Sequence, residues 1–139
     1  MDNTFHYLLM AEHSIFQKEL IARLKGSGLT IGQPKVLDYL KDHDGASQKD
    51  IARGCHIEPG TLTTLLNRME EADLVERRML YGNRRSLYVF ITEKGKQKLR
   101  LITDAFAEIE SAAFKGISDK EQSTLLDLLN RIYQNIAPS

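Results

Sequence analysis

Thr63, Thr64 and Asn67 stand at spacings that place small polar side chains on one face of a helix, with Gly60 one turn before them. An Asn side chain can bind adenine through both its oxygen and its nitrogen, and the methyl and hydroxyl groups of Thr suit thymine and phosphate. A glycine at a helix start lets free N–H groups approach an anion closely. This pattern predicts a surface that reads base edges in DNA, although a polar helix face that only contacts water would look similar.

The second group of side chains that could bind an anion is basic and surrounds a turn. Residues 75–100 hold eight Lys and Arg against two Asp and Glu, an excess of six, whereas the whole chain has nineteen of each and no net charge. Such a block is usually a solvated face, but it is also what a phosphate-binding surface requires. Arginines at the tip of a two-stranded ribbon suit a narrow, A·T-rich minor groove. The arginines in question are Arg77, Arg78, Arg84 and Arg85.

Hydrophobic periodicity and capping residues predict six helices and one β-hairpin, in the order ααααββαα. The fold class is therefore mainly α with a small β-hairpin wing (α+β). Expected N-caps are Thr30, Ser47, Thr92 and Ser118. The expected helices are about 3–25, 30–43, 47–54, 59–73, 93–115 and 118–136, and the strands about 75–79 and 87–91.

Within this order, a short helix, a tight turn, a second helix with a small polar face and a basic hairpin follow one another without interruption. That succession is a winged helix-turn-helix, which we expect over residues 30–92 of a single domain spanning 1–139. The remaining segments, 1–25 and 93–137, are predicted to be dimerisation helices.

The long helix over 93–115 carries apolar residues at spacings of three, four, three and four, which is a heptad seam. A chain of 139 residues would find it hard to cover both this seam and the Leu-rich final helix. We therefore expect a second copy to cover them, the alternative being a seam that is covered within one chain. The predicted dimer contacts are Phe5, Leu8, Leu99, Ile102, Phe106, Ile109, Leu125, Leu129 and Ile132.

Five short segments carry a further signal: SQKDIA at 47–52, EPGTLT at 58–63, RMEEADLVER at 68–77, NRRS at 83–86 and ITEKG at 91–95. Together they resemble the MarR-type (multiple antibiotic resistance regulator) family of winged-helix regulators, over nearly the whole chain. The resemblance implies a homodimer on a pseudo-palindromic operator, with recognition helices in successive major grooves and wings in the flanking minor grooves. Two-fold symmetry would place the recognition helices about 34 Å apart.

Two positions depart from the family pattern. Asn83 stands where the wing usually has Asp, so the minor-groove arginine, Arg85 by position, would lose a charge-assisted partner and Arg84 could share its role. Glu58 caps the recognition helix where Ser or Asp is typical, and its charge would repel a nearby phosphate. The DNA-contacting residues expected overall are Ser47, Gly60, Thr61, Thr63, Thr64, Asn67, Arg68, Arg77, Asn83, Arg84 and Arg85.

The resemblance also implies an effector site, because regulators of this family often bind small molecules, frequently aromatic and anionic, between the dimer helices and the DNA-binding lobe. The lining would come from the first, second and fifth helices. Each of the candidate residues would equally suit an ordinary core. The candidates are His6, Met10, His13, Phe16, Tyr39 and, less directly, Phe106.

Redox, metal and catalytic chemistry find little support in the sequence. The single cysteine, Cys55, excludes an internal disulfide and lies in the turn between the two DNA-binding helices, where packing is favoured over oxidant sensing. The four histidines, His6, His13, His43 and His56, lack metal-ligand spacing. No nucleophile–base pair or glycine-rich phosphate loop suggests an enzyme, and no cofactor is expected.

Two other function classes stay open: a winged-helix module that binds an acidic protein, and a metal- or redox-responsive regulator. The basic hairpin favours DNA over the protein partner, because a protein-binding wing would more often expose aromatic or aliphatic anchors. No run approaches the roughly 20 apolar residues of a membrane span, and the N-terminal stretch lacks a basic region before its short apolar run. The expected compartment is the cytoplasm.

Overall fold

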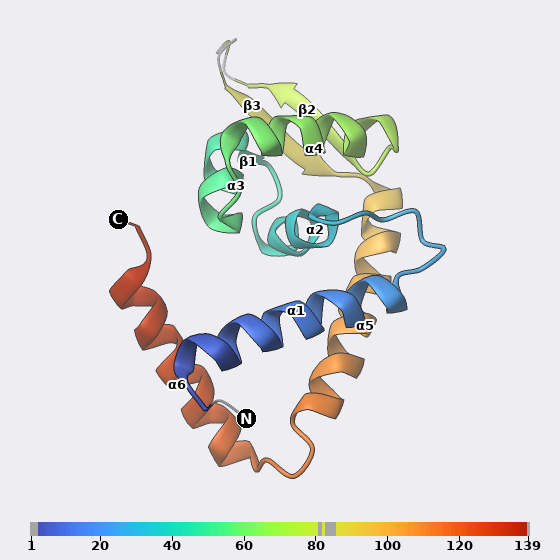
Figure 1. Ribbon diagram of the computed structural model, residues 1–139. Helices are drawn as coiled ribbons and strands as arrows, with labels where there is room; N and C mark the ends of the chain where they lie inside the picture. The colour runs from blue at the N-terminus through green and yellow to red at the C-terminus, as the bar shows by residue number, and fades with distance from the viewer. Residues whose placement is uncertain (1–2, 81, 83–85, 139) are drawn as a thin grey trace. The chain divides into compact units, whose positions relative to one another are not determined.

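A computed structural model describes residues 3–80, 82 and 86–138 of the chain (Figure 1). Two compact units are present, residues 1–106 and 107–139, with one helix passing from the first to the second. The elements in chain order are α1 (Phe5–Arg23), α2 (Gln33–Asp42), β1 (Ala46–Ser47), α3 (Gln48–Cys55), α4 (Pro59–Glu71), β2 (Val75–Met79), β3 (Leu87–Ile91), α5 (Glu93–Ala113) and α6 (Asp119–Ile136). All six predicted helices and both predicted strands are present.

Side-chain caps explain where most helices begin. The Ser47 hydroxyl accepts the Asp50 N–H at 3.1 Å, and the Thr92 hydroxyl accepts the Gly95 N–H at 3.0 Å. Ser118 makes a complete capping box with Glu121. These three predicted caps are confirmed.

The start of α2 differs from its prediction. Gln33 Oε1 does accept the Thr30 N–H at 3.2 Å, yet α2 begins at Gln33 rather than at Thr30. The reason is Gly32, whose φ of 93° only glycine adopts readily, and which becomes the N-cap. Pro34 then falls in the first turn, where its missing N–H costs least.

The wing is part of a three-stranded antiparallel sheet in the order β1-β3-β2. The predicted hairpin is confirmed, with Val75 opposite Ile91 and Met79 opposite Leu87. The additional strand, β1, pairs Ala46 with Val89. A two-residue strand is too short to show an alternating pattern, so it could not be recognised before its partner was placed.

The core of the first unit forms where α2, α3, α4 and the sheet meet. Leu37, Ile51, Leu66 and Val89 are among its fully buried side chains, one from each of these elements. In Figure 1, α4 lies along the sheet, and it contacts both β2 and α3. Burial of one side of α4 therefore leaves its polar side facing solvent.

The heptad seam of α5 requires a correction. Leu99, Ile102 and Ile109 are buried in the single chain, with Ile102 fully so, and Phe106 is half-buried. The three buried residues pack within one copy and leave almost no surface for a second one, whereas Phe106 keeps an exposed part and stays a predicted contact. The heptad spacing was interpreted as an intermolecular seam, but the same spacing also fits a helix buried by its own chain.

Gly54 was expected to end the third helix, but α3 continues to Cys55. His56, in the left-handed region at φ 55°, ends the helix instead. The glycine is needed for close packing: a Cβ atom at position 54 would lie 2.4 Å from the Tyr39 ring. Tyr39 in turn stacks on His43, with ring centroids 4.1 Å apart.

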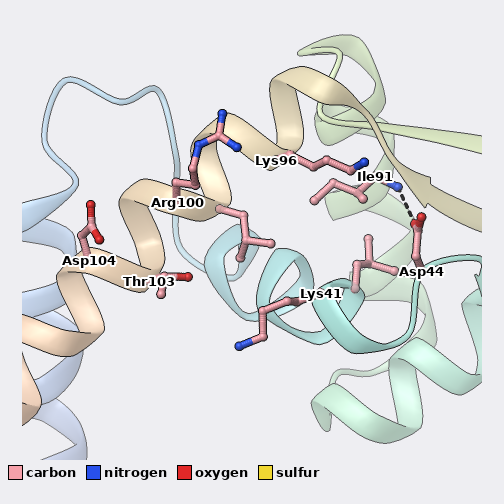
Figure 2. A pocket seen from close by; sticks show the side chains of 9 residues that line it. Lys41, Asp44, Ile91, Lys96, Arg100, Thr103 and Asp104 are labelled. Carbon is pink, nitrogen blue, oxygen red and sulfur yellow. Dashed lines mark hydrogen bonds between the residues drawn. The ribbon is translucent and has the colours of Figure 1, made fainter.

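A pocket of about 600 Å³ opens where α2 ends, β3 ends and α5 begins. Leu40, Leu99 and Ile91 supply its apolar part. Figure 2 shows the charged side chains around it, which come from α2, the residues after it and α5. They are Lys41, Lys96, Arg100, Asp44 and Asp104, with Thr103 beside them.

Candidate functional site

The solvent-facing side of α4 carries the residues predicted to read DNA. Thr61, Thr63, Thr64, Asn67 and Arg68 are all exposed, as the prediction requires. Gly60 is exposed too, and a Cβ atom there would have no neighbour within 4 Å. The polar side of the helix is therefore accessible to a large ligand along its length.

The two central threonines use their hydroxyl hydrogens within the helix. Thr63 donates to the Pro59 carbonyl at 3.0 Å, and Thr64 donates to the Gly60 carbonyl at 3.3 Å. Each hydroxyl oxygen keeps lone pairs for an outside donor, and each side chain keeps its methyl group. Toward solvent these residues offer acceptors and apolar contact.

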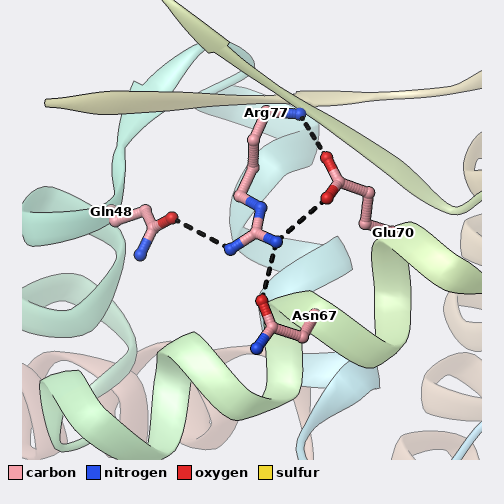
Figure 3. Close-up of polar contacts among 4 residues, drawn as sticks. All are labelled: Gln48, Asn67, Glu70 and Arg77. Carbon is pink, nitrogen blue, oxygen red and sulfur yellow. Dashed lines mark hydrogen bonds and ion pairs between the residues drawn. The ribbon is translucent and has the colours of Figure 1, made fainter. Parts of the chain in front are cut away.

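Arg77 of β2 does not extend into solvent as the sequence suggested. Its guanidinium donates to Asn67 Oδ1 at 2.7 Å, to Glu70 Oε1 at 2.9 Å and to Gln48 Oε1 at 3.4 Å (Figure 3). Its backbone N–H donates to Glu70 Oε2 at 3.1 Å, and only 15% of the side chain is exposed. Arg77 is thus a link between the wing strand, α4 and α3, which corrects its assignment as a groove-facing cation.

Glu70 and Gln48 are the functional neighbours that the sequence did not indicate. Glu70 and Arg77 lie seven residues apart on two different elements, so no helical or strand period relates them. The hydrogen bond from the Arg77 side chain holds the pKa of Glu70 below its ordinary value, partly offset by burial. The carboxylate therefore stays ionised and paired with Arg77 at neutral pH.

Arg78, the next residue of β2, is exposed and contacts side chains of β2 and of the neighbouring strand β3. It donates to Glu76 at 2.8 Å, and its guanidinium carbon lies 4.3 Å from the centroid of the Phe90 ring. Asn83, Arg84 and Arg85, the predicted tip of the wing, lie outside the described residues. Ser47 is half-buried and serves as the cap of α3.

Cys55 is buried at the end of α3, and its thiol faces the Lys35 carbonyl oxygen at 3.8 Å. Burial raises the pKa of the Cys55 thiol to about 11. A reactive cysteine needs the opposite shift, because the thiolate is the nucleophile. Cys55 therefore fills space between the DNA-binding helices.

The residues predicted to line an effector site do not gather at one place. Phe16 and Phe106 do meet, with ring centroids 6.0 Å apart, and both line a pocket of about 230 Å³ between α1, α2 and α5. Tyr39 is in the stack with His43, while His6, Met10 and His13 are exposed on α1 and do not line this pocket. No group of three or more possible metal ligands was found among the described residues.

Known proteins share this arrangement. A family profile described as "MarR family" matches residues 27–86. An HTH-type transcriptional repressor of Mycobacterium tuberculosis is 30% identical over 95 residues, which cover 68% of this chain and 68% of the repressor. The chain belongs to the MarR family.

Other relatives extend the match in sequence and in structure. A putative transcriptional regulatory protein for the hcr operon of Thauera aromatica is 28% identical over 107 residues, covering 77% of this chain and 64% of that protein. The crystal structure of a Staphylococcus aureus MepR–DNA complex superposes with a TM-score of 0.83 at 26% identity, covering 97% of this chain and 99% of that one.

This MarR-family member is thus a DNA-binding transcriptional regulator with the winged-helix fold. Within the described part of the chain, none of the helices combines the length and apolar character of a membrane span.

Proposed function

We propose that this MarR-family chain is a homodimeric repressor that binds a pseudo-palindromic operator in the cytoplasm and acts by binding rather than by catalysis. The observation that carries the proposal is the accessible polar side of α4, where Thr63, Thr64 and Asn67 lie together. The DNA complex of the similar MepR supports DNA as the ligand of this helix. The wing would place Arg84 and Arg85 in the flanking minor groove.

Unburied apolar side chains support the homodimer. In the first unit, α1 buries only Leu20, and Phe5 is 57% exposed. In the second unit, α6 has no buried residue although it carries large apolar side chains, including Leu125 and Leu129. Apolar helix faces of this kind are usually covered by another chain, and the predicted contacts Phe5, Leu8, Leu125, Leu129 and Ile132 remain candidates for it.

A gel-shift titration over a salt series tests the proposal directly. The protein should bind an inverted repeat from DNA flanking its own gene far more tightly than a shuffled duplex, and both affinities should fall with salt. Equal affinity for the two duplexes would leave only non-specific binding, and no binding to either would favour a protein partner for the wing.

We further propose that a small anion releases the DNA by binding in the 600 Å³ pocket between α2 and α5. Ligand pockets commonly measure about 300–1,000 Å³, so this pocket is large enough, whereas the 230 Å³ pocket at Phe16 and Phe106 is small. Lys41, Lys96 and Arg100 line the pocket together with Asp44 and Asp104. Asp44 accepts the Ile91 N–H at 2.8 Å, and Lys96 is paired with Glu93 at 3.4 Å, which leaves Lys41 and Arg100 as the cations for a ligand. The remaining cations suit a carboxylate, and the apolar floor suits a ring.

Benzoate is a suitable probe for this second proposal. Arg100→Ala should raise the benzoate concentration needed to release operator by roughly tenfold, the effect of losing one charge-assisted hydrogen bond. Lys94→Ala is the matched control, since Lys94 is an exposed cation of α5 that does not line the pocket. Release that is unchanged in Arg100→Ala would place the benzoate elsewhere, and no release from the unmodified protein would exclude this ligand class.

A further inference from the structure

The amide of Asn67 has a fixed orientation in the structure. Its oxygen accepts a hydrogen bond of 2.7 Å from the Arg77 guanidinium. A guanidinium has five N–H donors and no acceptor, so it selects the amide oxygen and repels the amide NH₂ group. The NH₂ group of Asn67 is therefore the part that remains for another partner.

The guanidinium that imposes this orientation is itself held in place. Glu70 accepts from both the side chain and the backbone N–H of Arg77, and Gln48 accepts from its second terminal nitrogen. These bonds join β2, α3 and α4, and they leave little of Arg77 exposed. Turning the Asn67 amide would cost the bond to Arg77 and place two donors face to face.

We propose that Arg77 makes Asn67 a donor-only reader, so that this position selects guanine rather than adenine. This inference rests on the proposed function. Bidentate binding of adenine needs the Asn oxygen to accept from adenine N6 while the NH₂ group donates to N7. Here Arg77 takes one of the two lone pairs of the oxygen, and the positive charge beside the second lone pair disfavours a further donor such as adenine N6. Guanine presents two acceptors, O6 and N7, to the major groove and matches the free NH₂ group.

The neighbouring threonines sharpen the pattern. The hydroxyl hydrogens of Thr63 and Thr64 are bonded to carbonyls of α4, so these side chains offer acceptors and methyl groups. Among Thr63, Thr64 and Asn67, only Asn67 then offers a side-chain donor to a base edge. The donor Asn67 lies nearer the C-terminal end of α4 than the acceptors Thr63 and Thr64. This order would define the direction in which α4 lies along the operator.

Selection of binding sites from a randomised duplex pool tests the proposal. Asn67→Ala first identifies the base pair that Asn67 contacts, as the position where preference is lost. At that position the unmodified protein should prefer guanine over adenine by about tenfold, within the range expected for one base contact. In Arg77→Met the amide is free to turn, and the preference should move toward adenine.

Arg78→Met is the matched control, because it removes the same charge from the next residue of β2 without contacting Asn67. It should lower affinity for all sequences and keep the guanine preference. Thermal melting verifies that each variant is folded.

Should Arg77→Met fail to fold, Asn67→Asp provides a second test. The carboxylate keeps the pair with Arg77 but can only accept, so preference should move from guanine to cytosine, whose N4 is a donor. Selection of adenine by the unmodified protein, or an unchanged preference in Asn67→Asp, would overturn the inference while leaving sequence-specific binding intact. Loss of all sequence preference in the unmodified protein would instead remove the proposed function.

Discussion

At the scale of single residues, the polar side chains near α4 form two groups. Some bond to other parts of the fold, and others are available to contact base edges. The Arg77 side chain donates hydrogen bonds to Glu70 of α4 and to Gln48 of α3, and these bonds hold the elements together. The Thr63 hydroxyl donates to a carbonyl of its own helix. Asn67 takes part in both groups, because its oxygen accepts from Arg77 while its NH₂ group makes no hydrogen bond to the residues that the structure describes. In the base reading that we propose for α4, the chemistry of Asn67 therefore depends on residues that would not themselves touch DNA.

The ion pair between Glu70 and Arg77 predicts a pH-dependent stability. Because the pKa of Glu70 is lowered on folding, its contribution is complete above the unfolded pKa, near 4.3, and is lost as pH falls through the folded value. Glu70→Gln should lower the free energy of unfolding at pH 7 by up to about 1 kcal/mol, since the pair is partly exposed. Urea unfolding at pH 7 and pH 3 should show this difference shrinking at the lower pH.

Glu71→Gln supplies the comparison for that measurement. Glu71 is the next residue of α4 and is exposed, so its replacement should have little effect at either pH. A Glu70→Gln deficit that persisted at pH 3 would show that the side chain stabilises the fold by packing instead of by charge.

Arg85, outside the described residues, is the strongest candidate for minor-groove contact by its position in the wing motif. Arg85→Ala should weaken operator binding strongly and lower the slope of log affinity against log salt by about one unit, as expected for one lost cation–phosphate contact. Gel shifts at four or more salt concentrations measure this slope. An unchanged affinity would transfer the role to Arg84, for which the same series can be made.

At the scale of elements, the junction between the wing and α5 is unusually tight. The Thr92 N–H donates to the Leu74 carbonyl at 3.1 Å, and the Thr92 hydroxyl donates to the Asp73 carbonyl at 2.6 Å. A Cβ atom at Gly95 would lie 2.2 Å from the Leu74 carbonyl oxygen. The first turn of α5 is thereby anchored on the turn between α4 and β2.

Gly95→Ala should therefore displace α5 from this turn. Because the obstructing atom belongs to the backbone and cannot rotate away, we expect a loss of about 2 kcal/mol or more in the free energy of unfolding. Gly60→Ala is the control: it has no neighbour within 4 Å, and alanine in a helix is favoured over glycine by roughly 0.5–1 kcal/mol. Denaturant unfolding measures the free energy of unfolding of both variants. Equal values for Gly95→Ala and Gly60→Ala would contradict this view of the junction.

Features that depend on neighbours in the sequence could be predicted from the sequence alone. Features that depend on residues far away in the chain could not. Ser47 and Ser118 bond within their own turns, so their caps were predictable. The strand β1 exists because β3 lies beside it, and Gly54 is small because Tyr39 packs against it. For the same reason, the helical spacing of the α4 threonines was enough to predict that they lie on one exposed face. The bond between Arg77 and Glu70 and the pocket at Arg100 could be recognised only in the folded structure.

At the scale of the whole molecule, the interpretation of the long helices changes the dimer that we expect. Ile102 and its buried neighbours on α5 stabilise one copy, so they have no surface left for a partner. Among the described residues, large exposed apolar side chains are most numerous on α1 and, in the other unit, on α6, whereas Leu101 is one on α5. We therefore expect the proposed two-fold pairing of recognition helices to depend on the terminal helices more than on the seam of α5.

Leu129→Glu tests that dependence. Leu129 is 41% exposed on α6, and a carboxylate there would be costly to bury against a second copy but harmless in water. The unmodified protein should sediment at twice 15.8 kDa, while Leu129→Glu should sediment as a monomer at micromolar concentration and lose preference for the inverted repeat. Gln134→Glu adds the same charge to an exposed position on the opposite side of α6 and should remain dimeric. If Leu129→Glu remained dimeric with full operator affinity, the two recognition helices would have to be paired through α1 alone, and the same substitution at Phe5 would then be the one that separates them.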